Sequence, residues 1–333
     1  MKNNILVLGS GAREHALVRA LHRSPQKKEI FCLATNINPG ISSLCNELSI
    51  KDINDIDSVV TYAQRVGASL VIVGPENPLA CGVVDALLRV NIKTVGPTKK
   101  LAQLETSKTF TRNLLKKHNI PGGPKYKTFN SLDGTTAFLN ELGGNYVVKN
   151  DGLAGGKGVK VSGEHLFSHE EALYFCQELL RGGNRFIVEE KLVGEEFSLM
   201  SFCDGETLKH MPVVQDHKRA YEGDLGPNTG GMGTYSDTNH SLPFLTNDDI
   251  SQAQKINIET ASALKKNFNE GYKGIIYGGF MVTAGGLRLI EYNARFGDPE
   301  AMNVLSLIET DFIELCHAIV DGTLINVDVK FKK

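Results

Sequence analysis

The chain has 333 residues, of which 41% are hydrophobic and 22% are charged, and its formal net charge is -2. This length favours two or three packed domains, and the balanced charge gives no sign of a polyanion partner such as nucleic acid. The six cysteines are scattered, the first residues lead directly into an apolar strand, and no stretch has the unbroken apolar length of a membrane span. We therefore expect a cytoplasmic protein without membrane insertion.

The first hundred residues alternate short apolar strands with helices. A strand at residues 4–9 precedes a helix with helical spacing of Ala16, Leu17, Ala20 and Leu21. Three further strands are expected in the segments "IFCLAT", "LVIVGP" and "KTVGP", with helices near 55–66 and 79–90. This alternation predicts a doubly wound parallel sheet covered on both faces, which we assign to a Rossmann-like domain of residues 1–103.

The remainder, residues 104–333, is expected to be an α+β region. One helix in "LETSKTFTRNLLKKHNIPGGP" ends at a Pro and Gly cluster, which marks a linker or subdomain edge. A strand-rich lid is expected at about 124–190, with one helix near 169–181. The final third is expected to contain strands near 196–203, 273–284 and 287–293, and helices near 248–268 and 299–321.

The segment "GSGAREH" follows a strand and opens a helix, a position whose backbone N–H groups favour an anion. It does not fit a dinucleotide fingerprint, because Glu14 stands at the third glycine position and Asn36 stands where an acidic residue would bind the ribose. Two interpretations stay open: a phosphate-binding turn, which Arg13 favours, and a turn whose glycines only permit tight packing.

The segment "DGLAGGKGV" is not a Walker loop, because Lys157 is followed by Gly158 and then by a strand. Between two strands it can be a flap that closes over phosphates, or a solvent-exposed hairpin. Another glycine-rich stretch, "GPNTGGMG", follows a charged run, and it can be a solvated loop or a polar ligand site.

Lysines and acidic residues between these stretches are ambiguous by themselves. Lys149 ends the strand "YVVK" and Lys108 lies on a helix, but a lone lysine is usually solvated. The run "FIVEEKLVGEEFS" is either an acidic surface or a nucleotide site, in which a base packs on the strand end and a carboxylate binds the ribose. Its acidic residues are Glu189, Glu190, Glu195 and Glu196.

The segment "LIEYNARFGDPE" predicts a strand whose residues Glu291, Asn293 and Arg295 point to one side. A carboxylate, an amide oxygen and a guanidinium suit a metal ion together with a phosphate. The alternative is a ladder of surface ion pairs.

In this order, the motifs resemble those of the ATP-grasp enzymes, and in particular the glycinamide ribonucleotide synthetase family. The resemblance covers nearly the whole chain and depends on "GSGAREHAL", "GPENPL", "DGLAGGKGV", "PNTGGMG" and "RFGDPEAM". It implies a pre-ATP-grasp domain followed by an ATP-grasp domain. It also implies a ligase of purine biosynthesis that uses ATP to join glycine to 5-phosphoribosylamine through a glycyl phosphate.

The resemblance also assigns residues. Glu291 and Asn293 would hold Mg2+ or Mn2+, and Arg295 and Asp216 would be catalytic. The residues implied for ATP are Lys108, Lys149, Gly152, Gly155, Gly156, Lys157, Gly158, Glu189, Glu190, Leu192 and Glu196. Those implied for the substrates are Gly9, Gly11, Arg13, Glu14, Pro75, Glu76, Asp216, Lys218, Asn228, Gly230 and Arg295.

Family members usually continue into a further C-terminal domain, which we expect to be absent here. A monomer or weak dimer is expected, with small-molecule substrates as its partners. The alternatives are an ATP-grasp ligase for a different amine or amino acid, a nucleotide-binding short form without catalysis, and a dehydrogenase, which the failed fingerprint disfavours.

Overall fold

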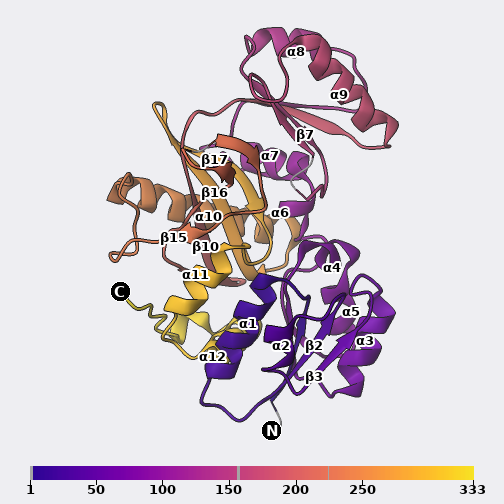
Figure 1. Ribbon diagram of the computed structural model, residues 1–333, viewed down its shortest axis with the longest axis vertical. Helices are drawn as coiled ribbons and strands as arrows, with labels where there is room; N and C mark the ends of the chain where they lie inside the picture. The colour runs from indigo at the N-terminus through magenta and orange to yellow at the C-terminus, as the bar shows by residue number, and fades with distance from the viewer. Residues whose placement is uncertain (1–2, 156–157, 224) are drawn as a thin grey trace.

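The computed structural model describes residues 3–155, 158–223 and 225–333 (Figure 1). The N-terminal sheet is parallel, with the strand order β3-β2-β1-β4-β5. Its central strand is buried at every residue. The predicted doubly wound sheet is therefore confirmed. Its strands are β1 (Asn4–Leu8), β2 (Glu29–Ala34), β3 (Glu47–Ile50), β4 (Leu70–Val73) and β5 (Lys93–Val95).

Helices cover both faces of this sheet. Side chains of the central strand alternate between two apolar cores, because successive strand residues point to opposite faces. Leu6 and Leu8 belong to one core, whereas Ile5 and Val7 belong to the other. The helices of this region are α1 (Ala12–Arg23), α2 (Pro39–Ser42), α3 (Ile56–Arg65), α4 (Glu76–Cys81) and α5 (Val83–Arg89).

Two details of this region differ from the sequence prediction. The helix expected near 79–90 is divided into α4 and α5 at Gly82, whose φ of +96° lies in the left-handed region that favours glycine. Strand β3 was not predicted. It lies at the sheet edge and has no fully buried residue, so its sequence lacks a strong apolar run.

A second, antiparallel sheet forms the centre of the molecule, with the order β11-β10-β16-β17. Helix α10 (Asn247–Phe268) packs with one core of this sheet, and α11 (Glu300–Leu307) and α12 (Phe312–Asp321) pack with the other. A 3-10 helix follows at Leu324–Asn326. The strands are β10 (Gly194–Asp204), β11 (Leu208–His210), β16 (Lys273–Thr283) and β17 (Gly286–Asn293).

The single helix expected at 299–321 is two helices. The chain leaves the helical conformation at Ile308, which forms a bridge with Phe331. Asp311 then caps α12 by accepting a hydrogen bond from the backbone N–H of Ile313 at 3.0 Å. A capping aspartate starts a new helix because it satisfies an N–H group that has no partner within the helix.

The lid is a separate four-stranded antiparallel sheet, with the order β6-β9-β7-β8 and two helices. It lies at the opposite end of the molecule from the N-terminal sheet (Figure 1). The lid has an apolar core of its own, in which Phe129 and Phe186 stack at 5.2 Å. Its elements are β6 (Tyr126–Phe129), α8 (Thr135–Glu141), β7 (Tyr146–Asn150), β8 (Val159–Val161), α9 (His169–Arg181) and β9 (Phe186–Glu190).

The helix expected before the lid is also divided. Ser107 separates α6 (Gln103–Thr106) from α7 (Lys108–Lys117), and its hydroxyl accepts a hydrogen bond from Phe110 N at 3.1 Å. Two small ribbons lie beside the central sheet, β12 (Gln215–Asp216) with β15 (Thr234–Tyr235) and β13 (Arg219–Tyr221) with β14 (Leu225–Asn228). None of the helices in the described ranges is both long enough and apolar enough to cross a membrane.

Candidate active site

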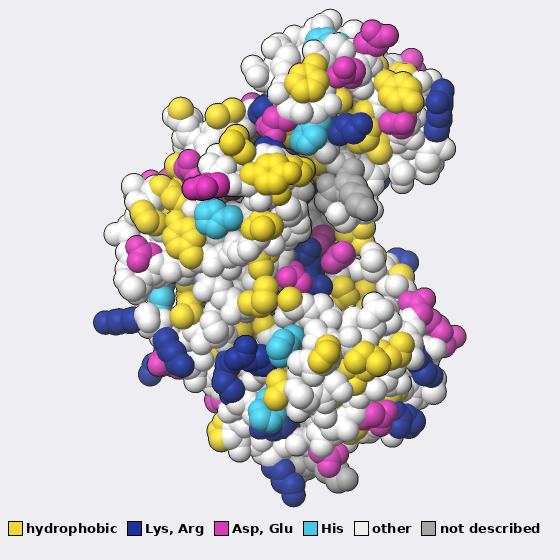
Figure 2. All heavy atoms as spheres, viewed as in Figure 1, with side chains coloured by type: hydrophobic (Ala, Val, Ile, Leu, Met, Phe, Trp, Pro, Cys, Tyr) yellow, Lys and Arg dark blue, Asp and Glu magenta, His cyan; other side chains and the backbone are white. Residues whose placement is uncertain are grey.

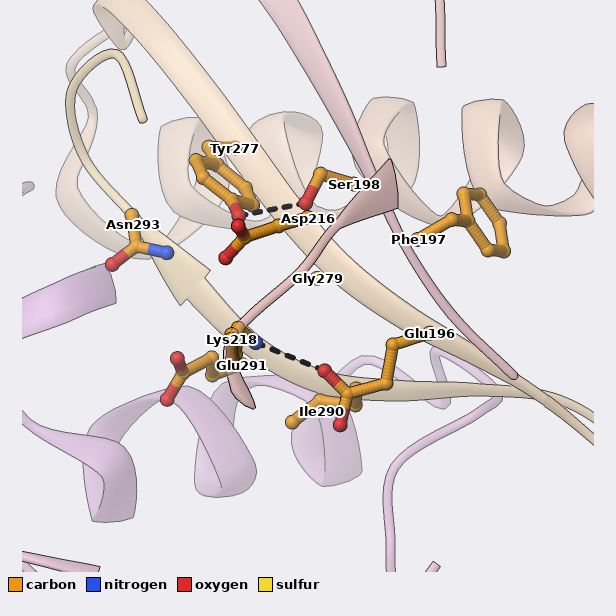
Figure 3. A pocket seen from close by; sticks show the side chains of 10 residues that line it. All are labelled: Glu196, Phe197, Ser198, Asp216, Lys218, Tyr277, Gly279, Ile290, Glu291 and Asn293. Atoms are coloured by element: carbon orange, nitrogen blue, oxygen red, sulfur yellow. Dashed lines mark hydrogen bonds and ion pairs between the residues drawn. The ribbon is translucent and has the colours of Figure 1, made fainter. Parts of the chain in front are cut away.

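The surface is hollowed between the lid and the N-terminal sheet, and acidic and basic side chains gather in this hollow (Figure 2). A pocket opens against the central sheet, with residues from β10, β12, β16 and β17 around it (Figure 3). Its lining residues are Glu196, Phe197, Ser198, Asp216, Lys218, Tyr277, Gly279, Ile290, Glu291 and Asn293. Five of these ten were assigned from the sequence.

The two proposed metal ligands lie on the last strand of the central sheet. Glu291 and Asn293 are two residues apart on β17, so their side chains share a face and line the pocket. Burial works against a charged Glu291, but Lys149, Lys108 and Lys218 lower the pKa of its carboxyl. An ionised carboxylate beside an amide oxygen fits a hard divalent cation. In the described part of the chain no three His, Cys, Asp or Glu side chains form a metal cluster.

Arg295 follows the end of β17 and joins three segments of the chain. Its Nη2 donates to Asn293 Oδ1 at 3.1 Å and lies 2.9 Å from Glu105 Oε1, and its Nε lies 3.4 Å from Glu76 Oε2. Its side chain is only 15% exposed, so the alternative of a surface ladder is wrong. Burial opposes the charge of Arg295, but Glu105 and Glu76 raise its pKa.

Glu105 was missed in the sequence analysis. It lies on the short helix α6, where an acidic residue looks like an ordinary surface residue, yet its second oxygen accepts a hydrogen bond from Ala294 N at 2.7 Å. Burial raises the pKa of Glu105 more than Arg295 lowers it. Glu105 therefore fixes the backbone and the guanidinium that follow the metal-ligand strand.

Asp216 and Lys218 approach the pocket from β12 and the residues after it. Lys218 Nζ lies 2.9 Å from Glu196 Oε2, as Figure 3 shows. The carboxylates of Glu196, Glu291 and Asp216 raise the pKa of Lys218, whose side chain is 46% exposed. Asp216 Oδ1 is buried and accepts no hydrogen bond from the described residues, and burial together with Glu300 raises the pKa of Asp216 to about 6.

A buried polar network that the sequence analysis also missed lies behind Asp216. Ser198 Oγ is 2.7 Å from Tyr277 Oη, and the Tyr277 hydroxyl donates to Glu300 (Figure 3 shows the first contact). Glu300 is 2% exposed. Its place in "RFGDPE" was the available signal, because that motif already contained Arg295.

Two of the three lysines assigned to ATP, Lys149 and Lys108, lie in the described residues and contact other parts of the protein. Lys149 is 7% exposed, and its Nζ lies 2.7 Å from Glu189 Oε2, so the interpretation as a solvated lysine is wrong. Lys108 Nζ donates to the carbonyl of Gly152 at 3.2 Å, at the start of the glycine-rich flap.

The flap is described only in part. Gly155 has a φ of +53°, and a Cβ atom at Gly158 would lie 2.5 Å from that of Ala154, so both positions favour glycine. Gly156 and Lys157, which were assigned to ATP, lie outside the described residues.

The acidic segment from Glu189 to Glu196 has several environments. Glu189 is 2% exposed, and Arg112 with Lys149 lowers the pKa of its carboxyl to about 2 in spite of burial. Glu190 Oε1 accepts from Lys125 N at 2.8 Å and pairs with Arg288. Leu192 is half-buried, and the glutamates range from the buried Glu189 to the exposed Glu195, so the segment is not acidic surface throughout.

The N-terminal turn lies beside the segment that carries Arg295. Arg13 is 7% exposed; its Nε lies 2.7 Å from Glu14 Oε1, and its Nη1 donates to the carbonyl of Phe296 at 3.3 Å. Glu14 accepts a hydrogen bond from the N–H of Gly11, and Gly9 has a φ of +117°. One N–H group of the predicted anion site is therefore occupied by the chain's own carboxylate.

The other residues assigned to the substrates lie at the start of α4 and in or after β14. Pro75 precedes α4 as its N-cap, and Glu76 begins that helix. Gly230 is exposed in the segment after β14. The side chain of Asn228 lies outside the described part of the structure.

Two family models match the chain in succession. One is described as phosphoribosylglycinamide synthetase, N domain, and matches residues 3–105; the other, described as its ATP-grasp (A) domain, matches residues 106–301. The phosphoribosylamine–glycine ligase of Methanosarcina barkeri is 46% identical over 329 residues, which cover 99% of this chain and 76% of the relative. That of Methanococcus vannielii is 48% identical over 335 residues, with 98% and 75% covered.

A solved structure agrees with these matches. The crystal structure of phosphoribosylamine–glycine ligase from Thermotoga maritima superposes with a TM-score of 0.79 and 26% identity, covering 96% of this chain and 75% of that chain. The chain thus spans about three quarters of the length of these relatives. Family models that together match residues 3–301, with the identities above, show that the chain belongs to the phosphoribosylglycinamide synthetase family of ATP-grasp enzymes.

Proposed function

We propose that this chain uses ATP to join glycine to 5-phosphoribosylamine, which gives glycinamide ribonucleotide, ADP and phosphate in purine biosynthesis. The observation that carries the proposal is the position of Glu291 and Asn293. They line one pocket, and the lysines assigned to ATP lower the pKa of Glu291. A metal-binding face next to cations that suit polyphosphate is what phosphoryl transfer requires.

In the proposed reaction a glycine carboxylate oxygen attacks the γ-phosphorus of ATP, and the bond to ADP breaks. The amine nitrogen of phosphoribosylamine then attacks the carbonyl carbon of glycyl phosphate, and phosphate leaves. The enzyme supplies no nucleophile, so catalysis depends on positioning and on neutralisation of charge.

We assign the residues as follows. A Mg2+ or Mn2+ ion held by Glu291 and Asn293 would polarise the phosphoryl oxygens. Arg295, held by Glu105, Glu76 and the carbonyl of Phe296, would present the remaining N–H of its Nη1 to the transferring group. Asp216, whose Oδ1 has no partner among the described residues, would bind the amino group of glycine.

The remaining assignments are also proposals. The turn with Gly9, Gly11 and Arg13 would bind the phosphoribosyl group, together with Pro75 and Glu76. The division into residues 1–103 and 104–333, with a lid at about 124–190, follows the sequence analysis. A cytoplasmic location and a monomer or weak dimer likewise stay predictions.

The test is ADP formation with Mg2+, ATP, glycine and freshly generated phosphoribosylamine, with each component omitted in turn and the product mass confirmed. If the chain is this ligase, ADP should form only when all four components are present. Turnover with another amino acid or phosphosugar amine would instead identify a related ligase. Binding of ATP without turnover would favour a nucleotide-binding protein.

Glu291→Gln tests the metal site directly. Removing the charge while keeping the shape should lower kcat at least about a hundredfold, because a metal ligand is weakened. Glu195→Gln is the matched control, since Glu195 is an exposed glutamate near the same site and should leave activity unchanged. Near-normal turnover of Glu291→Gln would contradict the assigned role.

A further inference from the structure

Arg112 is a buried arginine that the proposed chemistry has not used. It lies on α7 and is 3% exposed. Its Nε donates to Glu189 Oε1 at 2.6 Å, and its Nη2 donates to Glu189 Oε2 at 3.1 Å. Nη2 also donates to the carbonyl of Ile290, the residue before Glu291. One guanidinium therefore connects the last strand of the lid to the strand of the metal site.

Glu189 has more cationic partners than it needs. The fork of Arg112 occupies both carboxylate oxygens, and Lys149 Nζ lies 2.7 Å from Oε2 of the same group. A bidentate arginine–carboxylate pair is complete without a third partner. Lys149 therefore supplies a positive charge that Glu189 does not require.

Around Glu189 the cations outnumber the carboxylates. Arg112 and Lys149 both contact Glu189, so two buried cations share one buried carboxylate, whereas Lys218 is paired with Glu196. Because buried charge is unfavourable unless it is compensated, this cluster favours an additional anion.

The hydrogen bonding of Arg112 is incomplete, which lowers the stability of the folded state. Its Nη1 is buried and has no acceptor among the described residues. A buried donor without a partner destabilises the folded state, and such groups are typical of positions selected for another purpose.

We propose that Arg112 is a positioning residue for the nucleotide: it holds both oxygens of Glu189 and thereby leaves the ammonium of Lys149 available to a polyphosphate. This inference rests on the proposed contact between Lys149 and ATP. Without Arg112, Lys149 becomes the main counter-ion of Glu189, and a phosphate must then compete with a buried carboxylate for it. Lysine at position 112 could not replace the fork, because an ammonium is a point charge.

The experiment measures MgADP binding to the full chain by titration calorimetry, with Arg112→Met, Glu189→Gln and the double variant. Arg112→Met should weaken binding at least about tenfold, the effect of one charge-assisted hydrogen bond. The resemblance assigns Glu189 to ATP, but both of its oxygens contact Arg112 and Lys149, so Glu189→Gln removes a competing carboxylate and should recover most of that loss. Arg65→Met, which removes an exposed pair with Glu47, is the control and should bind MgADP as the parent does.

A purely structural role predicts a different result, because a second buried substitution would not restore binding. Unchanged binding in Arg112→Met, or loss without recovery in the double variant, would overturn the proposal. If Arg112→Met does not fold, Arg112→Lys with and without Glu189→Gln supplies the same comparison, with a smaller expected loss. In steady-state assays, the KM for ATP should rise while the KM values for glycine and phosphoribosylamine stay constant.

The two proposals fail in different ways. A parent chain that binds MgADP but forms no glycinamide ribonucleotide would refute the ligase and leave the role of Arg112 open to the same binding test. A parent chain that forms product, with no change on Arg112 substitution, would refute only the role of Arg112.

Discussion

The lid and the rest of the molecule are stabilised in different ways. The N-terminal sheet and the central sheet share both of their large apolar cores; Leu6 and Phe280 belong to one, and Ile5 and Phe202 to the other. Their backbones also meet closely, since a Cβ atom at Gly274 would lie 3.1 Å from the backbone of Gly96. The lid, in contrast, has a separate core. We call the two sheets with shared cores the body.

The contacts between lid and body are mainly polar. They include the pairs Arg112–Glu189, Arg288–Glu190 and Arg219–Glu164, and the hydrogen bonds of Ser107 and Thr109 with Asp151. Polar contacts can break and re-form with water, whereas separating a shared core exposes apolar surface. The lid is therefore the part that can move, and it is attached by groups that also surround the proposed ATP site.

The largest expected effect on the free energy of unfolding comes from substitutions in the lid core and in one core of the body. Phe186→Ala removes a fully buried ring from the lid, and Phe280→Ala removes one that stacks on Phe197 at 5.5 Å in the body. Each should lower the free energy of unfolding of its own region by about 3–5 kcal/mol. Hydrogen exchange should show Phe186→Ala loosening only residues 124–190, whereas Phe280→Ala should loosen both sheets of the body.

The conclusion that lid and body are stabilised separately would be wrong if Phe186→Ala increased hydrogen exchange in the N-terminal sheet as much as in the lid. Such a result would mean that lid and body unfold as one cooperative unit in spite of their separate cores.

The second expected effect is a pH-dependent loss of stability in the polar contacts between lid and body, which we call the lid attachment. The pKa of Glu189 is lowered from its ordinary value of 4.5 to about 2. A lowered carboxyl pKa stabilises the folded state at pH values above 4.5, and this stabilisation is lost as the pH falls toward 2. Between these values, exchange in β9 and β7 should rise before exchange in the N-terminal sheet.

Glu189→Gln separates this carboxyl from the other acidic groups. The variant should lose the part of the acid sensitivity that belongs to the lid attachment while keeping that of the body. An identical pH profile for lid exchange in the parent and in Glu189→Gln would show that Glu189 is not the responsible group.

The body was easier to predict from the sequence than the lid attachment, for a physical reason. Alternating apolar segments specify a parallel sheet through local patterns, and motif order led to the prediction that Glu291 and Asn293 on β17 hold a metal ion. The predicted boundaries failed where one residue ends a helix: Gly82 by a left-handed conformation, and Ser107 and Asp311 by side-chain caps. Such breaks depend on single residues inside a helical pattern.

Partners far apart in the sequence were not predictable in this way. Arg112 with Glu189 and Glu105 with Arg295 join residues on different elements, and each residue alone is typical of a surface. Their burial follows from the packing of whole elements, which no local pattern contains. Resemblance supplied the expected ligand residues, whereas the groups that hold those residues became evident only from the structure.

The smallest expected effect tests the exposed end of the attachment. Glu164 of the lid pairs with Arg219 of β13 and lies 3.1 Å from Lys191 Nζ, and these side chains are 24–32% exposed. Ion pairs of this exposure contribute up to about 1 kcal/mol. Glu164→Gln should therefore increase lid exchange only a few-fold and leave the body unchanged.

Glu141→Gln is the matched control, because the Lys125–Glu141 pair is more than half exposed. This pair lies entirely within the lid, so Glu141→Gln should leave hydrogen exchange at the lid residues that contact the body at the parent value. Unlike Glu141, Glu164 joins the lid to the ribbon of β13 and β14, which follows Asp216 and Lys218 in the sequence. A larger effect of Glu164→Gln than of Glu141→Gln would mean that this ribbon follows the lid when it closes. Equal effects would restrict the attachment to the buried charges around Glu189, and lid movement could then be transmitted to the pocket only through α7 and β17.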